Sequence, residues 1–565
     1  MPEAEEHNPA ETPAPSNTPV RALNRFVKSL PGLVAAWHWV RPNMTYFLTT
    51  RQPLLWLLAL LIGTSVGGGA IAFRELIAAF QLIWLQDMSE LVASAARRQP
   101  FWVILLAPVV GGAIVGLLLE KVMPGKRALG VADVIEARAM PARRIGFRSG
   151  VCSALIAAVS LGFGASAGRE GPLVHLGATI SNLFAEKMRL GERASRILLA
   201  CGVGAAVSAS FNVPIAGVLF AHEVILGHYA ASAFVPIVIS TVSGTILTRL
   251  YFGEHAAFII PDYQIISYWE FPAFAILGVV AAMVAVGFQV SLIGADWIAR
   301  NINLKLWMRP VLGGLLVGAI ATSFPEILGV GYEAINEALY GHLSIALLIS
   351  LTVMKTLATA ITLASRFGGG VFSPALYLGA MTGGAYGLIA ASVFPQLASS
   401  GGVYAILGMG AVAASVIGAP ISTVLIVFEL TGGYTLTIAL LITVAIAYGI
   451  TLALHGRSYF HWQLEMRGLF VQDGPHKYLV KNARVSEIMR PLETPQPFDP
   501  GSGDAYLRPS DTLETALRVF DAGGQERIAV VKQNDATIMI GHAVQVDALR
   551  QFNSALIRAS EEEHR

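Results

Sequence analysis

Charged residues are scarce in this chain of 565 residues. Asp, Glu, Lys and Arg together make up 13% of it and hydrophobic residues 54%, whereas about 25% of an average soluble protein is charged. This composition excludes an ordinary soluble protein and indicates a membrane protein. The formal net charge is only +2, so we expect no nucleic-acid partner.

Cysteine is also scarce, and residues 1–20 do not have the layout of a secretory signal. The two cysteines, Cys152 and Cys201, lie in apolar stretches and imply no disulfide framework. Residues 1–20 are acidic and rich in proline, which is typical of a disordered tail rather than a signal peptide. Basic residues are frequent at 21–51. Because basic flanks favour the cytoplasmic side, we expect the N-terminus to lie inside the cell.

Long apolar runs make up much of the remaining chain. A helix needs about 20 apolar residues to cross a bilayer. Runs near this length lie at 53–73, 101–119, 229–247, 270–294, 343–364 and 433–454. Others are shorter or interrupted by Gly and Pro, which a membrane tolerates only where protein or water satisfies the backbone. We therefore expect an all-α polytopic membrane protein of broken, tilted helices.

The hydropathy falls from about residue 468 onward. We therefore divide the chain into a transmembrane domain at 21–467 and a small α/β domain at 468–565. The second domain is expected on the cytoplasmic side, like the N-terminus. With both termini inside, the number of complete membrane crossings must be even.

The second domain carries its own signals. Asp511 or Thr512 is a candidate cap for a helix at 512–521, and residues 528–531 are typical of a short strand. Residues 493–504 are rich in Pro and Gly, which we interpret as a linker.

The apolar part contains an internal repeat. The segment FGASAGREGPLVHLGA aligns with FGGGVFSPALYLGA and pairs Pro172 with Pro374, an offset of 202. Further along, NVPIAGVLFAHEV aligns with GAPISTVLIVFEL and pairs Glu223 with Glu429, an offset of 206. Two matches in the same order and with nearly the same spacing indicate that half of the membrane part has been duplicated.

The repeats, at about 50–255 and 265–467, predict a binding site. Gly- and Pro-interrupted segments at matching positions of two halves point to a midplane site built from broken helices, in repeats of inverted topology. The alternative is that these glycines only let helices pack closely. We favour the site because the two matches share one register.

The glycine-rich segments are suited to anions. A helix start presents unpaired N–H groups and the positive end of the helix dipole, and glycine lets this backbone come close to an ion. Gly168, Gly171 and Pro172 precede one such helix, and residues 368–374 precede its counterpart. Two helix starts from two repeats would then converge on one anion.

Glu170 lies inside the first of these segments. A carboxylate within a membrane is costly and is a functional-site hypothesis by default. When ionised it would occupy the place of the anion, and when protonated it would leave, so we expect Glu170 to be a gate. The alternative, an ion pair with Arg169, is weaker because adjacent residues rarely face each other on a helix.

The other polar residues in apolar runs suggest structural roles. We expect Glu223 and Glu429 to bond to backbone amides near helix ends. Lys355, His175 and His222 are isolated, and snorkelling or local pairing accounts for them. No spacing of His, Cys, Asp or Glu suggests a metal site.

At GREGP, GGGVFSP and the paired PIxxVLxxxE segments, the sequence resembles the CLC family of chloride channels and proton/chloride antiporters, over about residues 50–470. The resemblance implies a homodimer of two-repeat subunits, each with its own anion pathway. It places Glu170 on the external gating glutamate of the family. It assigns anion binding to backbone amides of Val371 and Phe372, and to those of Gly168, Arg169 and Gly171.

The chain departs from the family at two hydroxyl ligands. A signature that is usually Gly-Ser-Gly-Ile-Pro corresponds to residues 128–132, so Leu129 or Gly130 replaces the serine that would bind the central anion. The family's tyrosine near the end of this domain corresponds to Phe460, although Tyr459 is its neighbour. If both hydroxyls are absent, the site binds anions more weakly, since a hydrogen bond to a charged group contributes about 1.5–3 kcal/mol.

Val224 is a third departure. Many antiporters of the family carry an internal proton-transfer glutamate at this position, and valine cannot carry a proton. This favours passive, channel-like conduction. A proton-coupled antiporter is the alternative, because some antiporters lack this glutamate and Glu223 or water could replace it.

The tail from about residue 484 resembles a CBS domain, through VSEIM, TLETALRVF, RIAVV and IGHAVQVDAL. Family members often carry two such motifs, which pair and can bind adenine nucleotides, but one is visible here. We therefore expect no cofactor, and favour an assembly or stability module over a nucleotide site.

Together these features predict a homodimer in the plasma (cell inner) membrane that transports chloride or a similar monovalent anion, with protons as possible co-substrates. A transporter of an organic substrate would need selective pocket groups that the sequence does not show. An enzyme is not expected, because no nucleophile–base pair or metal-ligand spacing is present.

Overall fold

The computed structural model describes residues 31–49, 52–140, 145–254, 258, 265, 267–393, 395–396, 398–470, 483–501 and 504–564. The chain divides into two compact units, Met1–Leu57 and Leu58–Arg565. The first unit contains helix α2 (Pro31–Thr49), which has Pro42 in its interior, and the first residues of α3.

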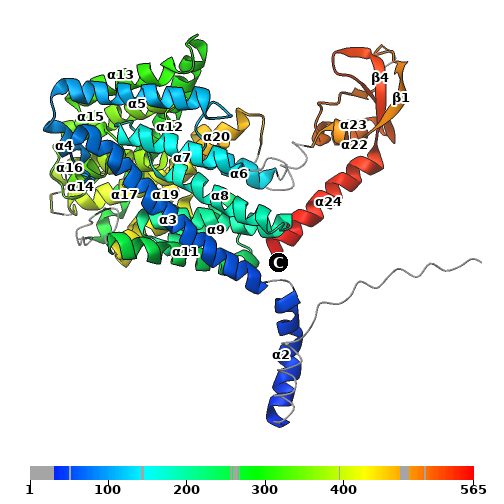
Figure 1. Ribbon diagram of the computed structural model, residues 1–565, viewed down its shortest axis with the longest axis horizontal. Helices are drawn as coiled ribbons and strands as arrows, with labels where there is room; N and C mark the ends of the chain where they lie inside the picture. Colours follow the sequence, from blue (N-terminus) through cyan, green and yellow to red (C-terminus); the bar gives the residue numbers. More distant parts are fainter. Residues whose placement is uncertain are drawn as a thin grey trace, which may run out of the picture. The chain divides into compact units, whose positions relative to one another are not determined.

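Eight helices in the described residues are long and apolar enough to cross a membrane. They are α3 (Gln52–Leu85), α5 (Phe101–Lys121), α9 (Glu192–Phe211), α11 (Ala231–Phe252), α12 (Phe271–Asn301), α15 (Ile345–Ala364), α16 (Phe372–Val393) and α19 (Tyr434–His455), all labelled in Figure 1. The six apolar runs of the sequence all fall within these helices, to within two residues at each start. The prediction of these spans is confirmed.

Shorter helices fill the space between the long ones. They are α4 (Val92–Arg97), α6 (Val131–Ala139), α7 (Phe147–Gly162), α8 (Glu170–Lys187), α10 (Pro214–Phe220), α13 (Met308–Ser323), α14 (Tyr332–Leu339), α17 (Gly401–Ile417), α18 (Pro420–Thr431) and α20 (Tyr459–Glu465), with a π-helical turn at Ala221–Leu226 and 3₁₀ turns at Tyr268–Glu270 and Pro325–Ile327. Broken helices of this kind confirm that the membrane part is not a bundle of straight spans.

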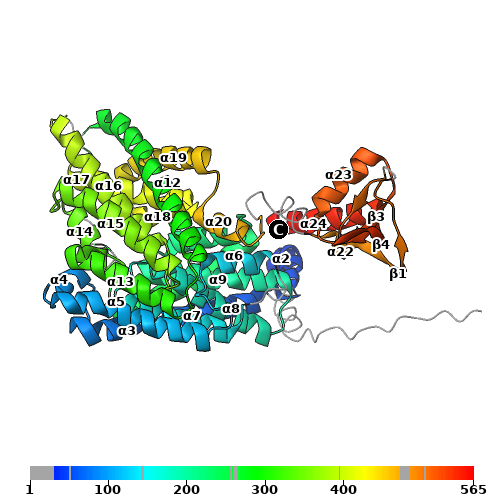
Figure 2. The same cartoon turned by 90° about the horizontal axis from the view of Figure 1, so that it is seen from above.

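Glycines let several of these helices pack closely. Helices α16 and α17 lie side by side (Figure 2), and a Cβ atom added at Gly383 would overlap the carbonyl oxygen of Tyr404. At the neighbouring Gly384 the same atom would meet Leu348 at 3.5 Å, an ordinary contact. Packing through small residues is typical of membrane helices, so close packing does explain the glycines of this pair.

The glycine-rich segments of the two repeats pair with each other. The amide of Gly168 donates to the carbonyl of Gly370 at 2.7 Å, and the amide of Gly370 donates back at 2.8 Å. A reciprocal exchange between corresponding residues is what a local two-fold relation between the halves requires.

A second reciprocal contact joins the repeats at α10 and α18. Both oxygens of the Glu429 carboxylate accept from the first amides of α10, at 3.0 and 2.6 Å. The Glu223 carboxylate accepts from the first amides of α18, at 3.1 and 2.7 Å. The prediction that both glutamates bond to amides near helix ends is confirmed.

The C-terminal residues form a separate four-stranded sheet in the order β1-β4-β3-β2, in which the β2–β3 pair is parallel and the other pairs are antiparallel. The strands are β1 (Met489–Pro497), β2 (Tyr506–Leu507), β3 (Arg527–Lys532) and β4 (Asp535–Val544), accompanied by helices α22 (Val485–Ile488), α23 (Leu513–Gly523) and α24 (Gln545–His564). Phe520 and Val530 belong to its buried core. Thr512 caps α23 by accepting from the Thr515 amide at 3.1 Å, as the sequence predicted.

The interpretation of residues 493–504 as a linker is wrong for their first half. Strand β1 continues to Pro497 and pairs with β4. An edge strand tolerates proline because the amides on its outer side need no partner in the sheet, and β1 lies at the edge. The pairing register also shifts between Pro491 and Gln496, so this strand has no regular alternation of side chains that the sequence could show.

Candidate functional site

Two cavities meet at Arg169 and Glu170. The first, which we call the main cavity, has a volume of about 330 Å³. Its lining includes Glu170, residues from 127–131 and 366–372, and the aromatic side chains of α20. The second cavity, of about 350 Å³, is lined by Arg169, Tyr332 and residues of α3 and the α3–α4 loop. Adjacent residues thus face different cavities, and this short segment separates them.

The segment lies between two helix starts. Helix α8 begins at Glu170 and helix α16 at Phe372, and the Gly168–Gly370 pairing holds the two starts together. The approach favours glycine, because a Cβ atom at Gly370 would lie only 3.0 Å from the Gly171 nitrogen, closer than most such contacts. The first amides of an α-helix have no acceptor within the helix, so the predicted convergence of two helix starts is present.

The Glu170 side chain is buried, with 3% of its surface exposed. The Tyr332 hydroxyl donates to Oε1 of this carboxylate at 2.8 Å. Within the described part of the chain, Oε2 has no hydrogen-bond partner. A Cβ atom at Gly168 would lie 2.6 Å from this Oε2 and 3.1 Å from the Ser373 nitrogen. The carboxylate is therefore close to the first turn of α16, where a helix attracts negative charge.

The Arg169 side chain is paired away from Glu170. Its Nη1 contacts Oε1 of Glu90 at 2.6 Å, and its guanidinium lies over the Tyr332 ring, 4.8 Å from the centroid. Arg74 also contacts Glu90, at 3.0 Å. Among the described residues, Arg169 and Glu170 do not form the ion pair that would have given Glu170 a purely structural role.

Gly168 does not offer its amide to an anion as expected. The amide is already bonded to Gly370, and one N–H group makes one good hydrogen bond. The contribution of Gly168 is instead the close approach of the two segments. Arg169 and Gly171 in the start of α8, and Val371 and Phe372 in the start of α16, remain the candidate donors.

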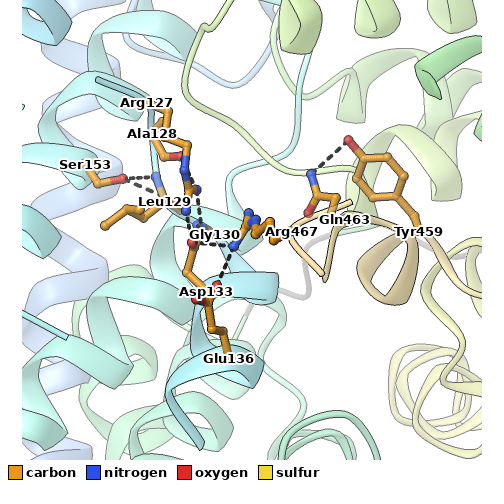
Figure 3. Close-up of polar contacts among 10 residues, drawn as sticks. All are labelled: Arg127, Ala128, Leu129, Gly130, Asp133, Glu136, Ser153, Tyr459, Gln463 and Arg467. Atoms are coloured by element: carbon orange, nitrogen blue, oxygen red, sulfur yellow. Dashed lines mark hydrogen bonds and ion pairs between the residues drawn. The ribbon is translucent and has the colours of Figure 1, made fainter. Parts of the chain in front are cut away.

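Two backbone amides of the loop at 127–130 are bonded to side chains of neighbouring helices (Figure 3). The Leu129 amide donates to Oγ of Ser153 at 2.7 Å, and the Gly130 amide donates to the Asp133 carboxylate at 2.8 Å. Both residues line the main cavity, but neither amide is free to bind an anion. Leu129 and Gly130 therefore lie beside the predicted anion site as lining residues, and their part in anion binding stays a prediction.

The two aromatic candidates at the other side of the main cavity are both buried. Phe460 and Tyr459 have 6% and 7% of their surface exposed, and both line this cavity. The Tyr459 hydroxyl accepts from Nε2 of Gln463 at 3.1 Å (Figure 3). Phe460 offers no hydroxyl to an anion, and the hydroxyl of Tyr459 already has a partner within α20.

An ion-pair cluster that the sequence did not reveal joins α6 to the end of α20. Arg127 contacts the Asp133 carboxylate at 3.1 and 2.5 Å, and Arg467 contacts Asp133 and Glu136 at 2.9 Å each (Figure 3). The charged residues that line the main cavity are four arginines and three acids: Arg127, Arg300, Arg366, Arg467, Asp133, Glu170 and Asp296. Arginines from distant segments give the cavity a basic surplus that favours anions.

Val224 lies in the π-helical turn after α10. Its neighbour Glu223 has both carboxylate oxygens bonded at the start of α18. No group of three His, Cys, Asp or Glu side chains that could hold a metal ion occurs among the described residues.

The chain is similar to known proteins over most of this region. A family model described as "Voltage gated chloride channel" matches residues 111–452. The "Putative chloride channel protein ClcB-like" of Ralstonia nicotianae is 32% identical over 392 residues, which are 69% of this chain and 91% of that protein.

Two solved structures share the fold. A slow cyanobacterial Cl⁻/H⁺ antiporter has a TM-score of 0.66 and 25% identity, covering 74% of this chain and 99% of that one. A eukaryotic CLC transporter has a TM-score of 0.63 and 21% identity, covering 88% of each chain. The family model and the Ralstonia relative show that the chain belongs to the CLC family of anion-transporting membrane proteins, a family of channels and transporters rather than of enzymes.

Proposed function

We propose that the chain conducts chloride, or a similar monovalent anion, passively across the membrane, and that Glu170 is its gate. One observation carries this proposal: Glu170 separates two cavities and directs an unpaired carboxylate oxygen toward the first turn of α16. A negative oxygen in that place competes with any anion that the helix start attracts.

The gate works by charge. Ionised Glu170 fills the place between the cavities and excludes an anion. Protonation removes the negative charge and, with it, the attraction of the side chain to the helix start. The amides of Arg169, Gly171, Val371 and Phe372 then face the anion. With the loop amides at 129–130 already bonded, few donors remain, and weak binding suits rapid release.

Passive conduction is favoured because the position of the family's internal proton-transfer glutamate is occupied by a valine. Val224 cannot titrate, and the Glu223 carboxylate is engaged at the start of α18. A proton-coupled chloride antiporter is the second candidate, because the chain is 25% identical to a cyanobacterial Cl⁻/H⁺ antiporter of the same fold.

The ratio of protons to chloride separates the two candidates. In liposomes that contain the purified protein, we expect a pH gradient alone to drive no uphill chloride movement, because Val224 cannot carry a proton and the Glu223 carboxylate is bonded at the start of α18. The reversal potential should follow the chloride gradient and ignore pH. If protons and chloride instead move in a fixed ratio, the protein is a proton-coupled antiporter and not a passive conductor.

We propose that the protein is a homodimer. Ile215 and Ile421 are exposed by 55% and 49%, beside the half-buried carboxylates of Glu429 and Glu223. A carboxylate that faces lipid is costly, and a second copy over this face would cover both. Light scattering of the solubilised protein should give the mass of two chains; the mass of one would contradict the dimer.

The remaining assignments complete the proposal. Residues 21–467 form the transport domain in the plasma membrane, and both termini lie in the cytoplasm. The tail predicted at 1–20 lies outside the described residues. Residues 468–565 form a CBS-like module for assembly or stability. A protease added to sealed, right-side-out vesicles should then leave both ends uncut.

A further inference from the structure

We infer that Tyr332 is a positioning residue for the gate: its hydroxyl holds the ionised Glu170 carboxylate in the closed place. The inference rests on the proposed function of Glu170. The hydroxyl lies 2.8 Å from Oε1, and both side chains are buried, with 4% and 3% of their surface exposed. No side chain from the elements around Glu170 makes another hydrogen bond to this carboxylate within the described residues.

The Tyr332 ring is fixed by its neighbours. The Arg169 guanidinium lies over one face, 4.8 Å from the ring centroid, and Phe258 packs edge-on with its centroid 4.8 Å away. Arg169 is held in turn by Glu90, which also binds Arg74. This network reaches the ring from the second cavity and leaves it little freedom to rotate.

The backbone before Tyr332 is equally constrained. The fully buried Lys355 donates to the carbonyls of Ile327 and Gly329, at 2.9 Å each. Gly331, with φ of 89°, precedes the helix, and a Cβ atom there would lie 2.7 Å from the Tyr377 ring. The hydroxyl therefore projects from the first residue of α14, behind a constrained turn, and not from a loop that could follow the glutamate as it moves.

A rigid donor acts on one state of the gate. A hydrogen bond to an ionised carboxylate is roughly twice as strong as one to a neutral group, so Tyr332 stabilises the closed, ionised state and loses much of its hold when Glu170 is protonated. The charged groups near this site are Arg74, Glu75, Glu90, Arg169 and Lys355 on the Tyr332 side, and Arg127, Asp133, Asp296, Arg300, Arg366 and Arg467 around the main cavity.

The test is Tyr332→Phe in liposome chloride flux measured across pH. The ring and its contacts stay while the hydroxyl is lost. A hydrogen bond to a charged group corresponds to a change of about tenfold or more in the closed-to-open ratio. We expect flux at neutral and alkaline pH to rise by about this factor, and the pH of half-maximal activation to move upward by about one unit.

Tyr377→Phe is the matched control. Its hydroxyl is also buried and has no hydrogen-bond partner among the described residues, and its ring lies beside Gly331, which precedes Tyr332. This variant should keep the wild-type pH profile. In a Glu170→Ala background, Tyr332→Phe should change nothing, because the carboxylate that it holds is gone.

Two results would be decisive against the inference. If Glu170→Ala abolishes the pH response but Tyr332→Phe keeps the wild-type profile, or loses flux while still folded, Tyr332 does not hold the gate. If Glu170→Ala leaves the pH response unchanged, the gate itself is wrong and the inference fails with it. Should Tyr332→Phe not fold, Tyr332→Met removes the same hydroxyl and must shift the profile in the same direction.

Discussion

Replacing Glu170 by Gln is expected to give chloride flux that is high at every pH and no longer rises in acid. Glutamine has the shape of glutamate but cannot ionise, so it cannot compete with an anion by charge. A closed gate whose open form is a minor state, at about 10% or less, predicts flux about tenfold or more above wild type at neutral pH. Reconstituted protein with a chloride-selective electrode provides the measurement.

The control for this variant is Glu186→Gln, which removes an acid from the exposed end of the same helix. It should leave the pH response as in wild type. A Glu170→Gln protein that still activates in acid would return Glu170 to a structural role, whatever its absolute flux.

The second large effect concerns stability. Glu429→Ala removes both acceptors at the start of α10, at Ile215 and Ala216. Each hydrogen bond to a charged group contributes about 1.5–3 kcal/mol, so the free energy of unfolding should fall by about 3 kcal/mol or more. We expect a clear drop in the temperature at which the detergent-solubilised protein loses its size-exclusion peak.

Two further variants calibrate that result. Glu429→Gln keeps one carbonyl acceptor and should lose less stability than Glu429→Ala. Glu120→Ala removes an exposed acid at the end of α5 and should melt like wild type. If all three variants melt together, the contacts that join the two repeats at this point do not stabilise the fold.

The parts of the fold that the sequence predicted have local signals. A transmembrane helix is a continuous apolar run, and a helix cap such as Thr512 stands three residues from the amide it accepts from. The duplicated motifs also revealed long-range structure, because matching positions in two halves imply matching environments. The roles of Glu223 and Glu429 followed from that register rather than from either residue alone.

The parts of the site that the sequence missed depend on tertiary contacts. Tyr332 lies 162 positions from Glu170 in the chain, and the partner of Arg169 is 79 positions away. Contacts between residues so far apart in the chain produce no periodic pattern in the sequence. The bonded amides of Leu129 and Gly130 were hidden for a similar reason, since the residue name does not show whether a backbone N–H already has an acceptor.

The central claim is that the Glu170 carboxylate and a permeant anion compete for one place beside the start of α16. Crystals of wild type and Glu170→Gln grown in bromide at neutral pH test this through the anomalous signal of the ion. The variant should show a bromide peak beside the Val371 and Phe372 amides at the start of α16, where wild type holds the carboxylate and shows none. Equal peaks in both proteins, or bromide only elsewhere in the variant, would contradict the claim.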